Sequence, residues 1–154
     1  MPETFRCRLE WTGATGGPLE GTAYSRDLDV QWEGLPTLPM SAAPAYKGDP
    51  TRLNPEQLFV ASLSSCQALT YLFLAARSAV GLVTYVDDAE GSLSVVDGRM
   101  RMSSVTLRPT ITLRPGADEA KALALVEKAH EGCFIANSVA TKVTLAPRVQ
   151  FRGT

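Results

Sequence analysis

The sequence predicts an α+β fold in one domain of 154 residues. Expected strands cluster in groups along the chain instead of alternating one by one with helices, which is typical of α+β rather than α/β proteins. One long apolar segment, Asn54 to Ala79, is typical of a buried central helix, and the strand groups lie before and after it. A chain of this length buries enough apolar surface for a sizeable single core.

The central helix has a clear start. Asn54 is suited to cap free backbone N–H groups, Pro55 to the first helical position, and Glu56 to the positive end of the helix dipole. Apolar residues then cover nearly every face, which predicts either burial on all sides or a membrane span. We expect a buried helix of a soluble protein, because polar residues interrupt the apolar run. These are Gln57, Ser62, Ser64, Ser65, Gln67 and Thr70.

The segment before this helix predicts a small antiparallel meander. Apolar and charged residues alternate from Phe5 to Trp11, so we expect a half-buried strand with Cys7 packed in the core. Gly13 to Gly17 is expected to form a turn. The next strand candidates are Thr22 to Tyr24 and Leu28 to Trp32.

Prolines and glycines predict that residues 33–53 form a loop. The loop is too apolar for a solvated linker, so it is expected to cover a surface or to close a site. Its larger apolar residues are expected to line a substrate pocket or to contact a second subunit. They are Leu35, Leu38, Met40 and Tyr46.

Beyond Gly81, where the helix is expected to end, the pattern predicts a second strand group. Leu82 to Val96 and Arg99 to Leu113 flank Asp97-Gly98, a strong signal for a tight hairpin. Alternation along the second arm predicts one buried face, and Pro109 within it indicates an edge strand or a bulge.

A second helix is expected over Ala117 to His130, with Gly132 as its stop. Strands at Lys142 to Leu145 and Val149 to Phe151 are expected to complete the fold. His130 is interpreted either as a base or as a cation that the end of the helix dipole favours.

Composition excludes several classes of function. The net charge of −1 gives no electrostatic footprint for nucleic acid. The beginning of the sequence has no apolar signal region and no lipidation motif, so we expect a cytoplasmic protein that does not bind a membrane. Cysteines in a reducing compartment are more often catalytic or metal-binding than structural. With no Cys-x-x-Cys motif and a single histidine, we expect no metal and no cofactor.

Cys66 and Cys133 are the candidates for chemistry, and two interpretations stay open. Cys66 is either a small buried apolar residue or a reactive thiol that acts together with Cys133. In the second case a thiolate attacks a peroxide oxygen and becomes a sulfenic acid, which condenses with the other thiol to a disulfide. That chemistry needs a positive neighbour for the thiolate and an apolar pocket for an organic peroxide.

Two motifs carry a resemblance to a known family. Asn54-Pro55-Glu56-Gln57-Leu58-Phe59 leads to Ser65-Cys66, and Ala129-His130 precedes Cys133-Phe134-Ile135-Ala136-Asn137-Ser138. Together they resemble the OsmC/Ohr family of osmotically inducible and organic hydroperoxide resistance proteins. The resemblance implies one OsmC-like domain over residues 1–154 and an intertwined homodimer with antiparallel sheets around the buried helix.

The resemblance also implies an activity and a site. It implies reduction of organic hydroperoxides, with Cys66 as the peroxidatic and Cys133 as the resolving cysteine. Glu56 and an arginine would hold the thiolate, and a dithiol such as a lipoylated protein would be the reductant. In the best-known members that arginine follows an early Gly-Gly pair, whereas here Gly16-Gly17 precedes Pro18-Leu19.

Arg26 is our first candidate for the missing arginine and Arg52 our second, although either is also interpretable as a solvated surface residue. The departure favours a rival function, a protein of this fold that binds an apolar small molecule without redox turnover. A second rival is a purely structural homodimer with buried thiols.

Helix geometry predicts how the site is assembled. Glu56 and Cys66 are ten residues apart, or roughly 15 Å along one helix, so the side chain cannot bridge them. Either the helix breaks near Ser64-Ser65, or Glu56 reaches the cysteine of a second subunit. The second solution is more economical, with two copies of the helix packed antiparallel near Ala61. We therefore predict an obligate homodimer with two sites, each built from both chains.

Overall fold

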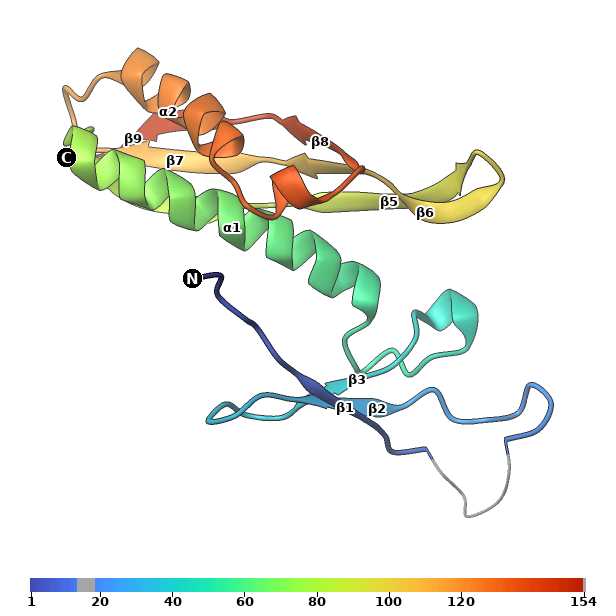
Figure 1. The fold of residues 1–154 in the computed structure, drawn as a ribbon. Helices are drawn as coiled ribbons and strands as arrows, with labels where there is room; N and C mark the ends of the chain where they lie inside the picture. The colour runs from blue at the N-terminus through green and yellow to red at the C-terminus, as the bar shows by residue number, and fades with distance from the viewer. Residues whose placement is uncertain (14–18, 154) are drawn as a thin grey trace. The chain divides into compact units, whose positions relative to one another are not determined.

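The computed structural model describes residues 1–13 and 19–153, and it forms two compact units, Met1–Leu58 and Phe59–Thr154. Figure 1 shows both units, coloured along the chain. Most of the expected turn at Gly13 to Gly17 lies outside the described residues, as does the Gly16-Gly17-Pro18 segment. Each unit is described by itself below.

The first unit contains the expected antiparallel meander. Its strands are β1 (Arg8–Trp11), β2 (Leu28–Gln31) and β3 (Leu38–Met40), paired in that order. Two predictions for this region are wrong. Residues 22–24 form no strand, and Cys7 is exposed rather than packed in the core. The reason is that β1 is an edge strand with every residue exposed, so its alternation has no buried face to serve.

The segment before the long helix is more ordered than the loop we expected. It contains β3 and a short 3₁₀ helix, η1 (Pro44–Tyr46). Met40 forms a parallel bridge with Leu53, and the Ser41 N–H donates to the Leu53 carbonyl over 2.9 Å. These contacts bring the end of β3 beside the residues that begin the helix.

Helix α1 (Pro55–Ser78) begins as predicted. The Asn54 N–H donates to Gln57 Oε1 (3.0 Å), and the Gln57 N–H donates to Asn54 Oδ1 (2.9 Å). This reciprocal capping box satisfies two backbone donors at the helix start. The helix runs without interruption to Ser78, where the chain turns through two residues of positive φ, Ala79 (48°) and Gly81 (78°).

Within a single chain, α1 is not buried on all sides. Only one line of residues, four positions apart, is buried: Leu63, Gln67, Tyr71 and Ala75. Large apolar residues on other faces are exposed, including Leu69 (68%), Phe73 (57%) and Leu72 (41%). A spacing of four residues keeps one stripe of a helix toward its neighbours, so this chain alone covers one face of α1.

The second unit carries two three-stranded sheets. One contains β4 (Leu82–Asp87), β7 (Pro109–Leu113) and β9 (Arg148–Phe151), and the other β5 (Glu90–Val96), β6 (Arg99–Leu107) and β8 (Lys142–Leu145). The β4–β7 and β5–β6 pairs are antiparallel, whereas β7–β9 and β6–β8 are parallel. The antiparallel pairs agree with the expected fold, but each sheet is mixed, because the last segment of the chain returns alongside β6 and β7 in their own direction.

Each arm of the predicted hairpin is divided into two strands. The tight turn is confirmed, with positive φ at both Asp97 (53°) and Gly98 (75°). The arms break at residues 88–89 and 108, opposite each other. Pro109 was expected at an edge or bulge but begins β7, the middle strand of its sheet. The first position of a strand tolerates a proline, because the missing N–H breaks no internal ladder bond.

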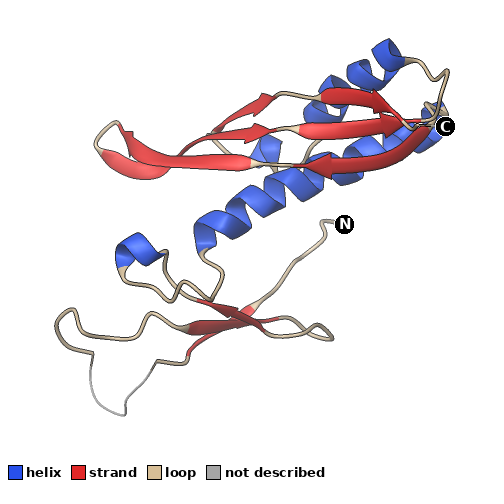
Figure 2. Ribbon diagram, turned by 180° about the vertical axis from the view of Figure 1, so that it is seen from behind, coloured by secondary structure: helices blue, strands red, loops and turns tan. Residues whose placement is uncertain are grey.

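Helix α2 (Glu119–Glu131) and the 3₁₀ helix η2 (Ala136–Ser138) complete the second unit. Asp118 caps α2 by accepting the Lys121 N–H over 2.9 Å, and Gly132 ends it as predicted. Figures 1 and 2 show that α1 and α2 lie on the same face of the strands of the second unit.

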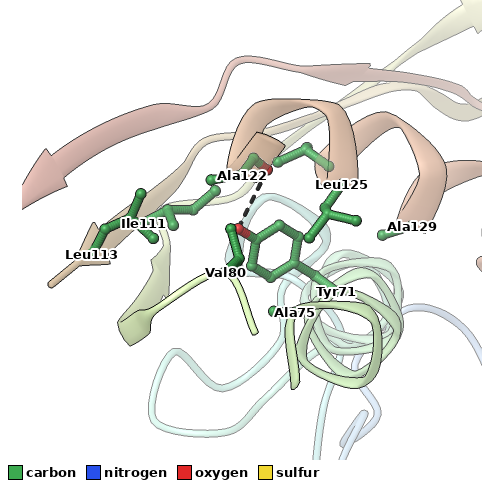
Figure 3. Packing of buried hydrophobic residues seen from close by; sticks show 9 residues of the cluster. Tyr71, Ala75, Val80, Ile111, Leu113, Ala122, Leu125 and Ala129 are labelled. Atoms are coloured by element: carbon green, nitrogen blue, oxygen red, sulfur yellow. Dashed lines mark hydrogen bonds between the residues drawn. The ribbon is translucent and has the colours of Figure 1, made fainter. Parts of the chain in front are cut away.

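The core of the second unit has two clusters. Figure 3 shows the first, where residues of α1, β7 and α2 pack around Tyr71, whose hydroxyl donates to the Ala122 carbonyl over 3.3 Å. The second cluster is Leu63, Val105 and Leu107 with their partly buried neighbours. Burial raises the pKa of Tyr71 to about 12, so the hydroxyl stays a donor. Because Leu63 and Tyr71 belong to different clusters, the turn of α1 between them is anchored on both sides.

Candidate active site

Cys66 lies on this anchored turn of α1. Its side chain is half-buried, and the Thr70 hydroxyl donates to its carbonyl over 2.9 Å. The apolar positions of the helix at Leu63 and Tyr71 pack inward on either side of it. The local sequence therefore places a partly accessible thiol on a rigid turn rather than on a loop.

Cys133 follows the end of α2 and is buried, with 1% of its surface exposed. Its backbone N–H donates to the His130 carbonyl over 3.1 Å, and its sulfur accepts the Ala136 N–H over 3.5 Å. Cys66 lies next to the Cys133 thiol, close enough to raise its pKa. The structure thus brings together the two thiols that the sequence singled out, although 66 other residues separate them along the chain.

The two thiols have unequal surroundings. Burial raises the pKa of the Cys133 thiol, and the neighbouring Cys66 side chain raises it further. Cys133 therefore holds its proton, while Cys66 is the more accessible sulfur. Both are free thiols, as is the exposed Cys7. An accessible sulfur beside a buried, protonated one is an arrangement that can close to a disulfide once the accessible sulfur is oxidised.

Arg26, the first candidate for the thiolate-holding arginine, lines a cavity in the first unit. Its guanidinium lies 4.2 Å from the centre of the Tyr24 ring and donates to the carbonyls of Tyr24 (2.8 Å) and Thr22 (3.3 Å). The cavity has a volume of about 300 Å³ and almost entirely apolar walls. It is lined by Trp11, Tyr24, Ser25, Arg26, Leu28, Ser41, Ala42 and Pro55.

Arg52, the second candidate, is neither solvated nor free. It forms ion pairs with Asp27 (3.9 Å), Asp29 (3.6 Å) and Asp49 (3.8 Å), and its side chain is 28% exposed. The pKa of Asp49 is lowered, first by hydrogen bonds from Thr51 and in smaller part by Arg52. Three carboxylates surround this guanidinium, so Arg52 connects β2 to the segment before α1 through ion pairs.

Glu56 lies in the first turn of α1 and is half-buried. The helix is continuous from Pro55 to Ser78, so the expected alternative of a break near Ser64-Ser65 is wrong. Ten residues of unbroken helix, roughly 15 Å, separate Glu56 from Cys66 of the same chain. The structure therefore does not bring these two side chains together within one chain.

Sequence reasoning missed two polar residues around Cys66. Gln67 is completely buried, and its Nε2 donates to the Val126 carbonyl of α2 over 3.0 Å. Asp87 accepts both the Ser64 hydroxyl and the Arg108 N–H, each over 2.6 Å, and so joins α1 to the break between β6 and β7. For Gln67 the available signal was its polarity inside an apolar helix, which we interpreted only as an argument against a membrane span.

Other candidate chemistry is weaker in the described part of the chain. No group of three or more histidine, cysteine, aspartate or glutamate residues there is arranged to hold a metal ion. His130 lies in the last turn of α2, with a buried Nδ1 that finds no hydrogen-bond partner among residues 1–13 and 19–153.

Comparison with known proteins identifies the family. A family model described as OsmC-like protein matches residues 48–147, well over half of the chain. The chain belongs to the OsmC-like family. The resemblance stated from the two cysteine motifs is thereby confirmed. A search of curated proteins found no match.

Solved structures agree with this family assignment. An OsmC-like protein of unknown function from Vibrio cholerae is 29% identical, with a TM-score of 0.86 over 95% of this chain and 99% of the other. An organic hydroperoxide resistance protein from Legionella pneumophila is 21% identical, with a TM-score of 0.64 over 97% and 99% of the two chains. The protein OhrB of Bacillus subtilis is 22% identical, with a TM-score of 0.63 over 95% and 98%.

The OsmC-like fold also bears on the long apolar helix. By length and composition α1 is able to cross a membrane, but core helices of soluble proteins are often as long and as apolar. The α+β fold that this chain shares with OsmC-like structures is a soluble fold. Within it, α1 is a packing helix that carries Cys66.

Proposed function

We propose that this OsmC-like protein is a thiol-dependent peroxidase that reduces organic hydroperoxides in the cytoplasm as part of an oxidative stress response. The observation that carries the proposal is the proximity of two free thiols, the half-buried Cys66 and the buried Cys133. The Legionella and Bacillus proteins of the same fold are both named organic hydroperoxide resistance proteins, which supports the proposal.

The two thiols suit a balanced reaction. The Cys66 thiolate attacks a peroxide oxygen, the O–O bond breaks, and the organic part leaves as an alcohol after it takes up a proton. Cys66 is then a sulfenic acid. The Cys133 sulfur attacks it, water leaves, and a Cys66–Cys133 disulfide remains. A dithiol reductant, such as a lipoylated protein, returns both cysteines to thiols by exchange.

Exposure assigns the two roles. Cys66 is half-buried and therefore open to a peroxide, which supports the peroxidatic role. Cys133 is 1% exposed, and its raised pKa keeps it a thiol until its neighbour is oxidised, which supports the resolving role. Neither role needs a metal or a cofactor.

The rest of the proposed site comes from a second copy of the chain. Glu56 cannot reach Cys66 along an unbroken helix, so we assign it to the site of the other subunit, together with Arg26. The exposed apolar face of α1 supports this assignment, because Leu69, Leu72 and Phe73 are large residues that a second helix would cover. The protein would then be an obligate homodimer with two shared sites.

Counting thiols tests the proposal directly. Reduced protein is treated with cumene hydroperoxide, and free thiols are titrated before and after. We expect two of the three thiols to be lost and mass spectrometry to find a Cys66–Cys133 disulfide. Cys66→Ser should consume no peroxide, whereas Cys133→Ser should leave a sulfenic acid on Cys66 that over-oxidises readily.

The exposed Cys7 provides the matched control for that experiment. Cys7→Ser should still lose two thiols and should consume peroxide at the wild-type rate. Peroxide turnover by Cys66→Ser at the wild-type rate would end the peroxidase proposal.

A second candidate function has one observation in its favour. The cavity of about 300 Å³ beside Arg26 is almost entirely apolar, which suits a protein that binds an apolar small molecule without redox turnover. In that case cumene hydroperoxide should leave the thiols unchanged, while an apolar ligand should raise the unfolding temperature. Unchanged thiols and no such ligand effect would instead favour a structural homodimer.

A further inference from the structure

Gln67, the residue after Cys66, has a buried side chain. A contribution to the stability of the fold does not explain why a polar residue stands there. Gln67 is completely buried in the middle of α1. Its Nε2 donates to the Val126 carbonyl over 3.0 Å, while its Oε1 finds no hydrogen-bond partner in the described part of the chain. A buried polar atom without a partner carries a desolvation cost, so such an atom needs a reason.

The acceptor does not need this bond either. Val126 lies inside α2, which continues to Glu131, so its carbonyl is also the helical acceptor for the N–H four residues later. An apolar side chain of similar shape at position 67 would leave the Val126 carbonyl paired and would remove the unpaired Oε1. The Val126 carbonyl therefore does not need the Gln67 amide as a donor. We look for the effect of this bond in the position that it gives α1 relative to α2.

That geometry concerns the spacing of the two helices that carry the thiols. The Tyr71 hydroxyl bonds the Ala122 carbonyl, and one turn away the Gln67 amide bonds the Val126 carbonyl. Residue numbers rise along α1 as they fall along α2, so the helices run antiparallel with these two bonds as successive links. Gln67 forms the link nearer to Cys66 and to Cys133, which follows the end of α2.

We propose that Gln67 is a positioning residue for the thiol pair. Its bond to α2 holds the turn of α1 at the spacing and register at which the Cys66 and Cys133 sulfurs meet. The inference rests on the proposed function in one respect, namely that the two cysteines form a redox pair. Gln67 acts on the sulfurs through the helix spacing and takes no part in bond making.

The test compares a disulfide equilibrium with the stability of the reduced protein. Wild type and Gln67→Met are equilibrated with glutathione and glutathione disulfide, so that two protein thiols are oxidised to a disulfide and one glutathione disulfide yields two glutathione molecules. We expect the equilibrium constant for Cys66–Cys133 closure to fall at least tenfold in Gln67→Met, a change of about 30 mV for a two-electron couple.

The same variant should leave the thermal midpoint of the reduced protein unchanged or higher, because it no longer buries an unpaired oxygen. Gln150→Met is the matched control. It removes an amide bond from Gln150 Nε2 to Thr112 Oγ1 (2.9 Å) on β9 and β7, which carry no cysteine, and should leave the closure constant unchanged.

Equal closure constants in wild type and Gln67→Met would overturn the inference, whatever the thermal midpoint of the variant. Should Gln67→Met fail to fold, Gln67→Leu is measured in its place with the same expected loss and the same overturning result. The wild type could close its disulfide more readily than Gln67→Met and still consume no peroxide. That result would contradict the proposed peroxidase function but not this inference.

Discussion

The two units of the chain hold their candidate residues by different physical means. In the second unit, two apolar clusters pack around the turn that carries Cys66. In the described part of the first unit, Val30 and Met40 are the buried apolar side chains, and Arg26 is held by backbone carbonyls and a ring instead. Thiols placed by a core and cations placed by local polar contacts should respond differently to substitution.

The difference also separates what one chain completes from what it does not. Cys66 and Cys133 meet within the second unit, because core packing of α1 against α2 brings them together. Glu56 starts the same helix too far from Cys66 to join them. A single chain thus contains the complete pair of thiols, but it does not place the proposed charged residues beside that pair.

The largest expected effect is complementation between two inactive variants. Glu56→Ala and Cys66→Ser homodimers should each lose peroxide consumption. After co-refolding, a heterodimer should regain about one working site, because a two-fold interface lets the intact Glu56 of one chain meet the intact Cys66 of the other. Peroxide consumption per verified heterodimer is the measurement.

A matched pair controls for nonspecific rescue. A heterodimer of Cys66→Ser and Cys133→Ser should not regain peroxide consumption. The two thiols lie together within one chain, and neither chain of this heterodimer carries both. A monomer at micromolar concentration by sedimentation, or no rescue in the Glu56→Ala mixture, would contradict shared sites.

The next effect is on stability and compares the two units. Leu63→Ala removes a fully buried side chain from the second unit and should lower the free energy of unfolding by about 2–5 kcal/mol. Val30→Ala in the first unit removes two carbons at a 7% exposed site and should cost roughly 1.5 kcal/mol, at about 0.8 kcal/mol for each. Urea unfolding of the reduced protein measures both values. Equal losses would show that the first unit has a core of comparable strength.

The smallest effect separates the two arginines. In a Cys7→Ser background, Arg26→Ala should slow iodoacetamide alkylation of Cys66 near neutral pH about tenfold, because a nearby guanidinium favours the thiolate. Arg52→Ala should leave that rate nearly unchanged, since three carboxylates already occupy the Arg52 guanidinium. If both variants react as fast as the parent, the thiolate has another partner.

Local signals in the sequence predicted the parts of the fold that local physics decides. The Asn54 cap and the Asp97-Gly98 turn need only neighbouring residues, and both predictions are confirmed. Burial is decided by distant segments, so the alternation near Cys7 misled us, and the apolar faces of α1 did not tell us which of them this chain covers. The parallel pairing of β8 and β9 likewise depends on where the chain returns, which no local pattern encodes.

The candidate site divides in the same way. Residue type and family resemblance singled out Cys66 and Cys133, and the fold brings them together. The roles of Glu56 and Arg26 stay predictions, because they depend on a second chain. Gln67 was missed because its importance comes from a bond to α2, and a sequence pattern gives no spacing between two helices.

The hydrogen bonds of the Asp87 carboxylate restrict which substitutions are compatible with this fold. One oxygen accepts the Ser64 hydroxyl and the other accepts the Arg108 N–H. Asparagine has nearly the same shape but offers a single acceptor oxygen, so its amide NH₂ would face one of these two donors. The Ser64 hydroxyl can turn and accept from that NH₂, whereas the Arg108 N–H can only donate. Asparagine at position 87 is therefore compatible with this arrangement only while position 64 keeps a hydroxyl or another acceptor, so positions 64 and 87 are expected to change together.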